Sequence, residues 1–304
     1  MSGFTLLVVS WVLLAIFVVA FVLRTVRIAR LPVHLRWELA PVPHEKGRSK
    51  YGGSYLEQYE WWTKPREKDL FSELLYMLQE IVLLKSVWEH NRRLWWFSFP
   101  FHIGMYVLIA AGALLLVGGA LEAAGVQTAA LGDWQGGITA LAGLGFAVGG
   151  VGALGLLVSR FADRRLREFT TPAALFNLLL LLAIFATGAY SLTVSQDFAL
   201  RVWGFATALV TADPSIEIPG ILAAHLFLTM LFLAYLPFSR MMHFVAKYFT
   251  YHEIRWDDEP LTAGGRLERE ALQLLDQPVT WAAPHVKSDG KKNWIDIATE
   301  ETKT

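Results

Sequence analysis

Two of the eight histidines in this 304-residue sequence lie inside long stretches that contain no charged residue. His102 lies in Leu94–Leu121, and His225 lies in Ile218–Ser239. Because an ionisable side chain at membrane depth is costly, it usually marks a functional site. The simpler alternative is a neutral imidazole that only bonds to a neighbouring helix. We would favour that alternative for one isolated histidine, but the arrangement of the others argues against it.

A third histidine, His243, follows His225 by 18 residues, which is five whole turns of an α-helix. If the last span continues as a helix through His243, the two imidazoles share one face and lie about 27 Å apart. Such a face suits two stacked cofactors, or one cofactor and a polar site. Haem needs an imidazole from each side, an apolar slot and small residues beside the macrocycle. Near His102, Gly104 and Gly112 could provide the small residues.

The residues leave two ligand pairings open. In the first, His102 pairs with His243, and His225 takes another partner or faces a quinone. In the second, His90 pairs with His243 and His102 pairs with His225. The second is weaker, because the twelve residues from His90 to His102 turn a helix about 120° from its starting face, and His90 lies in a charged segment. We expect the remaining histidines to be solvated or to contact a partner: His34, His44, His252 and His285.

Other metal chemistry fits less well. Zinc would need three or four ligands within one small site, and these histidines are too widely spread. The sequence contains no cysteine, so zinc–thiolate sites, iron–sulfur clusters and disulfides are excluded within this chain. Any iron–sulfur cluster in an electron path must therefore lie on a partner.

Membrane helices must position these residues. The sequence is 54% hydrophobic and 18% charged, whereas soluble domains are about 25% charged. Five stretches contain no charged residue, and each reaches the roughly 18–20 residues that a membrane-spanning helix needs: Phe4–Leu23, Leu94–Leu121, Trp134–Ser159, Phe169–Gln196 and Ile218–Ser239. We predict an all-α integral membrane protein, a bundle of five transmembrane helices, and exclude a soluble enzyme or a disordered chain. The predicted spans cover about residues 4–27, 94–121, 134–159, 169–196 and 218–245.

The positions of Lys and Arg predict the orientation of these spans. Segments 24–93, 160–167 and 240–303 hold almost all of them, whereas 122–133 and 197–217 together hold only Arg201. Because basic loops stay in the cytoplasm, the N-terminus is predicted outside and the C-terminus inside the cell (inner) membrane. The first segment lacks a basic n-region, so it is expected to be a retained span.

The remaining segments divide the chain into a membrane domain, residues 1–249, and a cytoplasmic tail, residues 250–304. Within the predicted cytoplasmic loop 28–93, the apolar spacing from Asp69 to Val82 indicates an amphipathic helix on the membrane or against a partner. The third span is rich in glycine, which predicts close approach to another helix. The tail is expected to be an extended arm that contacts a soluble partner. The lipid bilayer is an expected partner, and nucleic acid is not.

Several short strings carry a resemblance to known membrane cytochromes. The chain resembles the gamma subunit of respiratory nitrate reductase at Phe101-His102-Ile103-Gly104, His225, and Pro237-Phe238-Ser239-Arg240 followed by His243. It is more similar, over most of its length, to the cytochrome b subunits of heterodisulfide-reductase-like menaquinol oxidoreductases of sulfate reducers. That similarity rests on Arg36-Trp37-Glu38, Tyr51-Gly52-Gly53-Ser54-Tyr55, Trp61-Trp62 and Val279-Thr280-Trp281.

The resemblance implies one or two haem b groups between the second and fifth spans. It implies that His102 and His243 ligate the inner haem iron, and that His225 ligates the outer one. The usual partner of His225 would fall near Gly112, which cannot ligate iron. The implied function is the oxidation of menaquinol, or the reverse reaction, with electron transfer to a cytoplasmic iron–sulfur subunit of the heterodisulfide-reductase-like type. Such a subunit is not a complete enzyme alone, and further membrane or periplasmic subunits are possible partners.

A quinone pocket could lie on either side of the membrane. The polar residues predicted at the outer surface are Asp133, Gln135, Asp197 and Arg201, although each alone could be a plain loop residue. If only the inner haem exists, the pocket could be cytoplasmic. Two rival functions remain: a cofactor-free membrane anchor, which leaves His102 and His225 unexplained, and a small transporter. The transporter is the weaker rival, because the sequence shows no repeated span pairs and no charged residue within the five stretches.

Overall fold

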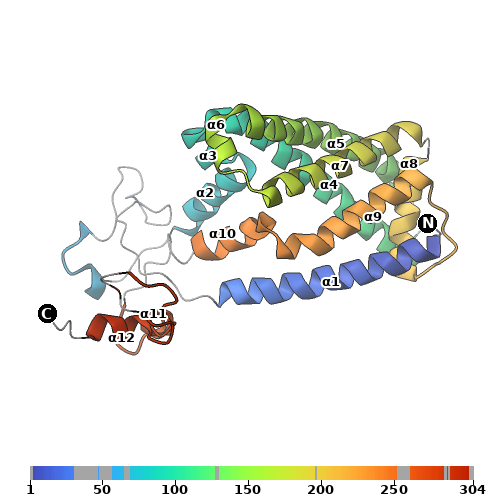
Figure 1. Cartoon of the computed structure of the whole chain (residues 1–304). Coiled ribbons are helices and arrows are strands. Elements are labelled where there is room, and N and C mark those ends of the chain that lie inside the picture. The colour runs from blue at the N-terminus through green and yellow to red at the C-terminus, as the bar shows by residue number, and fades with distance from the viewer. Residues whose placement is uncertain are drawn as a thin grey trace. The chain divides into compact units, whose positions relative to one another are not determined.

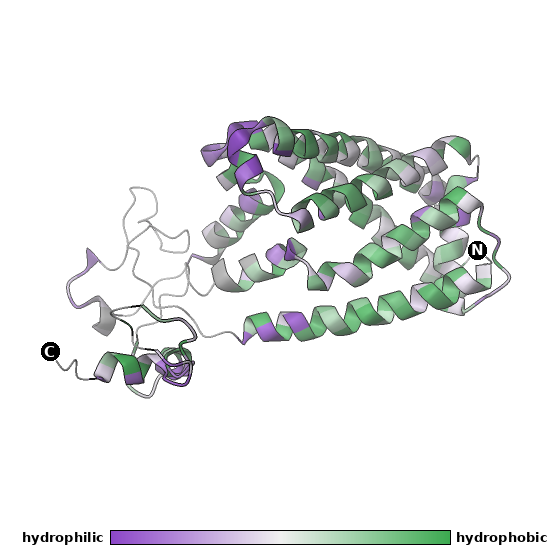
Figure 2. Cartoon of the chain, in the orientation of Figure 1, coloured by the Kyte–Doolittle hydropathy of each residue, from purple (hydrophilic) through white to green (hydrophobic). Residues whose placement is uncertain are grey.

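The computed structural model describes residues 3–30, 47, 57–64, 69–126, 130–195, 197–251, 261–283, 286 and 288–300. In these residues the secondary structure is helical, without a β-strand. Five helices are long and apolar enough to cross a membrane, which confirms the predicted fold class. They are α1 (Gly3–Ala29), α4 (Arg92–Ala123), α5 (Ala130–Ala162), α7 (Pro172–Val194) and α9 (Gly220–Tyr235), with the last span reaching Phe238. Figure 2 shows hydrophobic residues along most of each span.

The chain divides into two compact units. The first contains Met1–Phe21 and Met77–Ser239, and the second contains Val22–Tyr76 and Arg240–Thr304. In the first unit, α4 packs on α5, α5 on α7, and α7 on α9, while α8 (Phe198–Thr211) packs on α4 and α5 (Figure 1). Because α4 and α9 are joined through α5 and α7, α5 and α7 fix the helices that carry His102 and His225.

Glycine brings α4 and α5 into backbone contact. A Cβ added at Gly104 would lie less than 3.0 Å from the backbone of Gly149 and Gly145, and one at Gly152 would meet the backbone of Phe101 as closely. No other residue type leaves enough room for this approach, which is a common device in membrane helix packing. The prediction that the glycine-rich third span packs closely is confirmed.

The amphipathic helix predicted from Asp69 is present as α2 (Leu70–Val82). Its N-terminus is capped, because Asp69 accepts hydrogen bonds from the Ser72 amide at 3.0 Å and from the Ser72 hydroxyl at 2.7 Å. Its apolar side chains are exposed, including Phe71, Leu74 and Leu78. The short helices α3 (Lys85–His90) and α6 (Arg164–Glu168) precede α4 and follow α5.

The last span differs from the prediction at its end. The α-helix stops at Tyr235, two 3-10 turns follow at Leu236–Phe238 and Arg240–Met242, and Ser239 between them is extended. Pro237 explains the break, since proline has no N–H for the helix and its ring clashes with the carbonyl of the preceding turn. A new helix, α10 (His243–Tyr251), then begins. The prediction of one continuous helix through His243 is therefore wrong, and the inference that His225 and His243 share a face fails with it.

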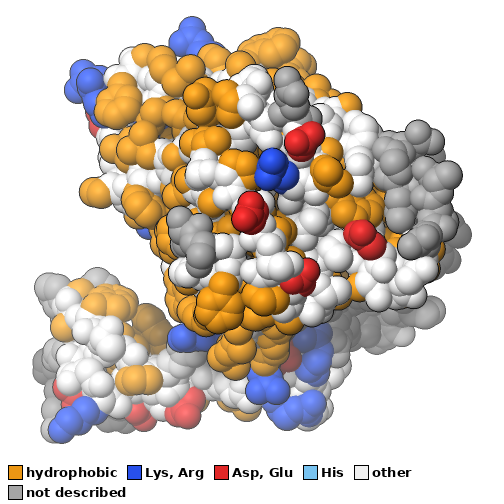
Figure 3. Space-filling model, turned by 90° about the vertical axis from the view of Figure 1, so that its right-hand side faces the viewer, with side chains coloured by type: hydrophobic (Ala, Val, Ile, Leu, Met, Phe, Trp, Pro, Cys, Tyr) orange, Lys and Arg blue, Asp and Glu red, His pale blue; other side chains and the backbone are white. Residues whose placement is uncertain are grey.

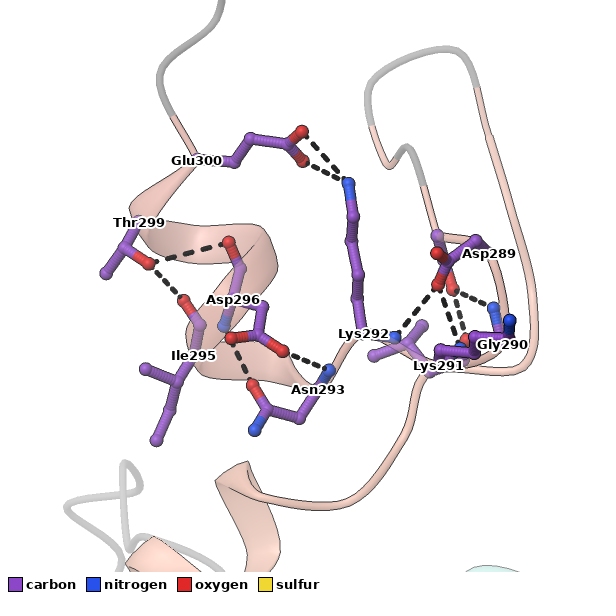
Figure 4. Close-up of polar contacts among 11 residues, drawn as sticks. Asp289, Gly290, Lys291, Lys292, Asn293, Ile295, Asp296, Thr299 and Glu300 are labelled. Atoms are coloured by element: carbon purple, nitrogen blue, oxygen red, sulfur yellow. Dashed lines mark hydrogen bonds and ion pairs between the residues drawn. The ribbon is translucent and has the colours of Figure 1, made fainter.

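The described part of the C-terminal tail forms short helices rather than an extended arm. Its helices are α11 (Arg266–Leu275) and α12 (Trp294–Thr299). In the segment that connects them, the side chains of Val279 and Val286 are buried. Figure 4 shows the polar contacts of α12 and the turn before it. Asn293 and Asp296 form the capping box of α12, and Asp289 accepts hydrogen bonds from the amides of Lys291 and Lys292. The Lys292 ammonium group donates to Glu300. The amides of Lys291 and Lys292 lower the pKa of Asp289 below its usual value, and the hydrogen bond to Glu300 raises the pKa of Lys292. Local polar contacts thus order a segment with few apolar residues.

Candidate functional site

His102 lies in the first third of α4 and is held by its own helix. Its Nδ1 is 2.7 Å from the carbonyl oxygen of Ser98. Because a carbonyl only accepts, Nδ1 must carry the hydrogen, and the lone pair is on Nε2. This is the tautomer that metal-binding histidines commonly use. The neighbouring rings of Phe101 and Tyr106 lie 5.2 and 6.2 Å from the imidazole, so the surroundings are aromatic. The donor atom and its setting fit an axial ligand of haem.

The two glycines near His102 have different surroundings. Two residues turn a helix by about 200°, so Gly104 points away from the His102 side. Gly104 faces α5 and serves the helix contact, so the expectation that it borders a macrocycle is wrong. A Cβ added at Gly112 would meet no atom within 4 Å. Ile109, two turns after His102 on the same side of α4, is 64% exposed. The His102 side of α4 is therefore the one that α5 and α8 leave uncovered.

His225 lies where α5, α7 and α9 meet. Its Nδ1 is 3.2 Å from the hydroxyl of Thr187 on α7, and its ring meets the Phe146 ring of α5 edge-on at 5.3 Å. The Thr187 hydroxyl donates to the Ala183 carbonyl at 2.7 Å, so it accepts from His225 Nδ1, and Nε2 again has the lone pair. A Cβ at Gly188 would lie 2.8 Å from the imidazole. The ring is only 7% exposed, so a macrocycle against it would require the surrounding side chains to separate.

Replacing Thr187 by valine tests this hydrogen bond. Valine keeps the shape of threonine but removes the hydroxyl that accepts from the buried Nδ1–H of His225, which should destabilise the protein by about 1–3 kcal/mol. The free energy of unfolding in detergent measures the loss. Thr187→Ser keeps the hydroxyl and should retain most of the stability. Equal stability of the wild type and Thr187→Val would show that the contact contributes nothing.

The other predicted ligands are on other helices. His243 is the first residue of α10 and belongs to the second unit, so its pairing with His102 stays a prediction. His90 is exposed at the end of α3, and its Nδ1 is 2.9 Å from the Ser86 carbonyl oxygen. Within the part of the chain that the structure describes, no three His, Asp or Glu side chains form a group that could hold a metal ion. His34, His44, His252 and His285 lie outside the described residues.

The four predicted quinone-contacting residues are partly brought together. Asp197 and Arg201, one turn apart at the start of α8, form an exposed ion pair at 3.9 Å, and Arg201 also approaches the Glu217 carbonyl at 3.4 Å. Gln135 is half-buried in α5, and Asp133 lies in the same helix, although its side chain is outside the description. Seen from the end where α8 and the N-terminus lie, separate charged side chains are scattered among hydrophobic ones (Figure 3).

Three polar contacts were not predicted from the sequence. Thr187 supports His225, Glu122 at the end of α4 accepts from the Trp203 indole at 2.6 Å, and Glu80 is buried against Ser86. Thr187 and Trp203 could not be found, because their partners are 38 and 81 residues away. Glu80 lay on the polar side of an amphipathic pattern, which usually means contact with solvent.

One of three comparisons with known proteins found a match. Residues 85–256 match the model of the nitrate reductase gamma subunit, which is more than half of the chain and extends from α3 past α10. The match includes His102, His225 and His243. Searches of curated proteins and of solved structures gave no match. With its spans and imidazoles placed as described, the chain belongs to the nitrate reductase gamma subunit family, a family of haem b-binding cytochrome b membrane subunits of respiratory oxidoreductases.

Proposed function

We propose that this chain is the haem b subunit of a menaquinol:acceptor oxidoreductase in the cell (inner) membrane. It exchanges electrons between the quinone pool and a cytoplasmic iron–sulfur subunit of the heterodisulfide-reductase-like type. The observation that carries the proposal is His102 on a membrane helix, whose Nδ1–H is bonded to the Ser98 carbonyl so that the Nε2 lone pair is the one that can ligate iron. An anchor without a cofactor would not need that arrangement.

His102 and His243 are the residues that would hold a haem, and His225 is the candidate ligand of a second one. Haem b, when bound, takes and passes on single electrons at a potential that its ligands tune. The Ser98 carbonyl fixes the ring of His102, and Thr187 fixes the ring of His225, so both imidazoles are oriented before any ligand binds. Asp133, Gln135, Asp197 and Arg201 are the proposed contacts of a quinone site at the outer end, and a site at the inner end is the alternative.

The composition supports the proposal of a partner subunit. With no cysteine, the chain cannot carry an iron–sulfur cluster, so electrons that leave it must pass to another subunit. The folded segment 261–300 contributes a surface for this contact, on which the Trp281 and Trp294 rings lie 5.9 Å apart and are both exposed. We propose that this tail docks the cytoplasmic subunit.

A reduced-minus-oxidised optical spectrum of the purified full chain tests the proposal. The expected result is the α band of haem b, with one or two haems per chain by pyridine haemochrome, and reduction of that band by a menaquinol analogue. A purified, folded chain without the band would be a cofactor-free anchor or a transporter. A band that dithionite reduces and quinol does not would leave a cytochrome with another electron donor.

A further inference from the structure

The first unit contains a buried carboxylate that the proposed function does not use. Among the Asp and Glu side chains that the structure describes, Glu80 is the buried one, with 4% of its surface exposed. It lies in the last turn of α2, whose neighbouring apolar side chains Leu78 and Ile81 are exposed instead. Burying a carboxylate costs free energy unless it is well paired. A helix that hides its acid and exposes its apolar residues is unlike an ordinary amphipathic helix.

Glu80 is held by the turn that follows it. The Ser86 hydroxyl lies 2.7 Å from Oε1 and 2.9 Å from Oε2. A hydroxyl has one hydrogen, so Ser86 can donate fully to only one carboxylate oxygen at a time. The same turn is bound to Gln79, which accepts from Lys85 at 3.2 Å. The carboxylate is therefore fixed in place, and its position depends on the segment from Gln79 to Ser86.

This segment is attached to the part of α4 that carries His102. The Tyr106 hydroxyl donates to the carbonyl oxygen of Ile81 at 3.1 Å, and the Trp95 indole donates to the carbonyl of Leu83 at 2.8 Å. Tyr106 lies one turn after His102, on the same side of α4. Through this hydrogen bond to Tyr106, Ile81, the residue after Glu80, contacts the side of α4 from which the His102 imidazole projects. The buried acid is therefore next in sequence to the residue whose carbonyl binds the Tyr106 phenol, and Tyr106 neighbours His102.

We propose that Glu80 accepts protons from a quinol that binds at this end of α4, beside Tyr106 and His102. The inference rests on the proposed function, and it assigns quinol oxidation to this end rather than to the Asp197–Arg201 end. Each hydroxyl O–H bond of the quinol breaks in turn, and its proton goes to the Glu80 carboxylate, which releases it to water before accepting the next. The quinol becomes a quinone, and its two electrons are taken, one at a time, by the cytoplasmic iron–sulfur acceptor. A carboxylate is a suitable base for this step, and apolar side chains exposed on α2 suit the approach of a lipid-soluble quinol.

The variant that tests this role is Glu80→Gln in the full chain with its partner subunit. Glutamine has the same size and its amide oxygen can accept from Ser86, but it cannot take up a proton. The rate of quinol-driven reduction should fall by about 10²–10⁴-fold, the contribution of a positioned general base. Haem content, reduction by dithionite and the midpoint potential should stay unchanged. The infrared difference spectrum between the quinol- and quinone-bound forms should contain a carboxylate band that Glu80→Gln lacks.

Two further variants separate a proton acceptor from a structural tie. Glu89→Gln removes an exposed carboxylate from α3 and should leave the rate and the infrared band as in the wild type. Ser86→Ala keeps the Glu80 carboxylate and should retain most of the wild-type rate of quinol-driven reduction. A normal rate or a retained band in Glu80→Gln would overturn the assignment. So would an equal loss in Ser86→Ala with full haem content, because that result assigns the effect to the hydrogen bond. A wild-type protein that binds haem but is not reduced by quinol would refute the proposed function instead.

Discussion

Replacement of His102 by alanine is expected to remove one haem per chain and to stop quinol-driven reduction of the partner subunit. The reason is that alanine deletes the Nε2 donor that the Ser98 carbonyl orients. Haem iron held by one remaining imidazole would lack its second axial ligand. The ratio of pyridine haemochrome to protein measures the loss. His243→Ala should give the same result if the two residues hold the same haem.

The matched control is His90→Ala. His90 is exposed at the end of α3, so its removal should leave the haem ratio unchanged under the pairing of His102 with His243. A wild-type haem ratio in both His102→Ala and His243→Ala would refute the ligand assignment. Loss of haem in His90→Ala as well as in His243→Ala would instead favour His90 as the partner of His243, with His102 then paired with His225. The three variants therefore distinguish the pairings that the sequence leaves open.

The parts of the fold that follow from local rules could be predicted from the sequence. Charge-free stretches long enough to span a bilayer became the five apolar helices, because hydrocarbon admits almost no charged side chain. Asp69 capped α2 as its position before an apolar periodicity indicated. The glycines of the third span allowed close packing against α4, which is their common role in membranes. None of these features depends on knowing which segments are neighbours.

The features that the sequence did not yield depend on tertiary contacts or on competing local signals. The 18-residue spacing of His225 and His243 favoured a continuous helix, whereas Pro237 between them ended it. The family resemblance could name both histidines without showing that they lie on different elements. Thr187 and Glu80 could be recognised only once their surroundings were known, since a hydroxyl within an apolar span and an acid on a helix are ordinary in a sequence.

Replacement of Gly104 by valine should strongly destabilise the first unit while leaving every imidazole in place. A side chain at this position would lie less than 3.0 Å from the backbone of Gly149, and backbone atoms cannot rotate away as a flexible side chain can. The helices α4 and α5 would have to separate. Overpacking typically costs about 1–3 kcal/mol, and we expect a value at or above the upper end. Unfolding of the purified protein in a denaturing detergent measures the change.

Gly112→Ala on the same helix is the control for this prediction. A Cβ at Gly112 meets no atom within 4 Å, and alanine is the better helix former by about 1 kcal/mol, so stability should not fall. If both variants lost stability equally, glycine would be required in α4 for a reason other than contact with α5. If only Gly104→Val lost stability, the ratio of haem to protein in that variant should be measured next. Because Gly104 and His102 are two residues apart, displacement of α4 should also reduce haem binding, although the imidazole itself is intact.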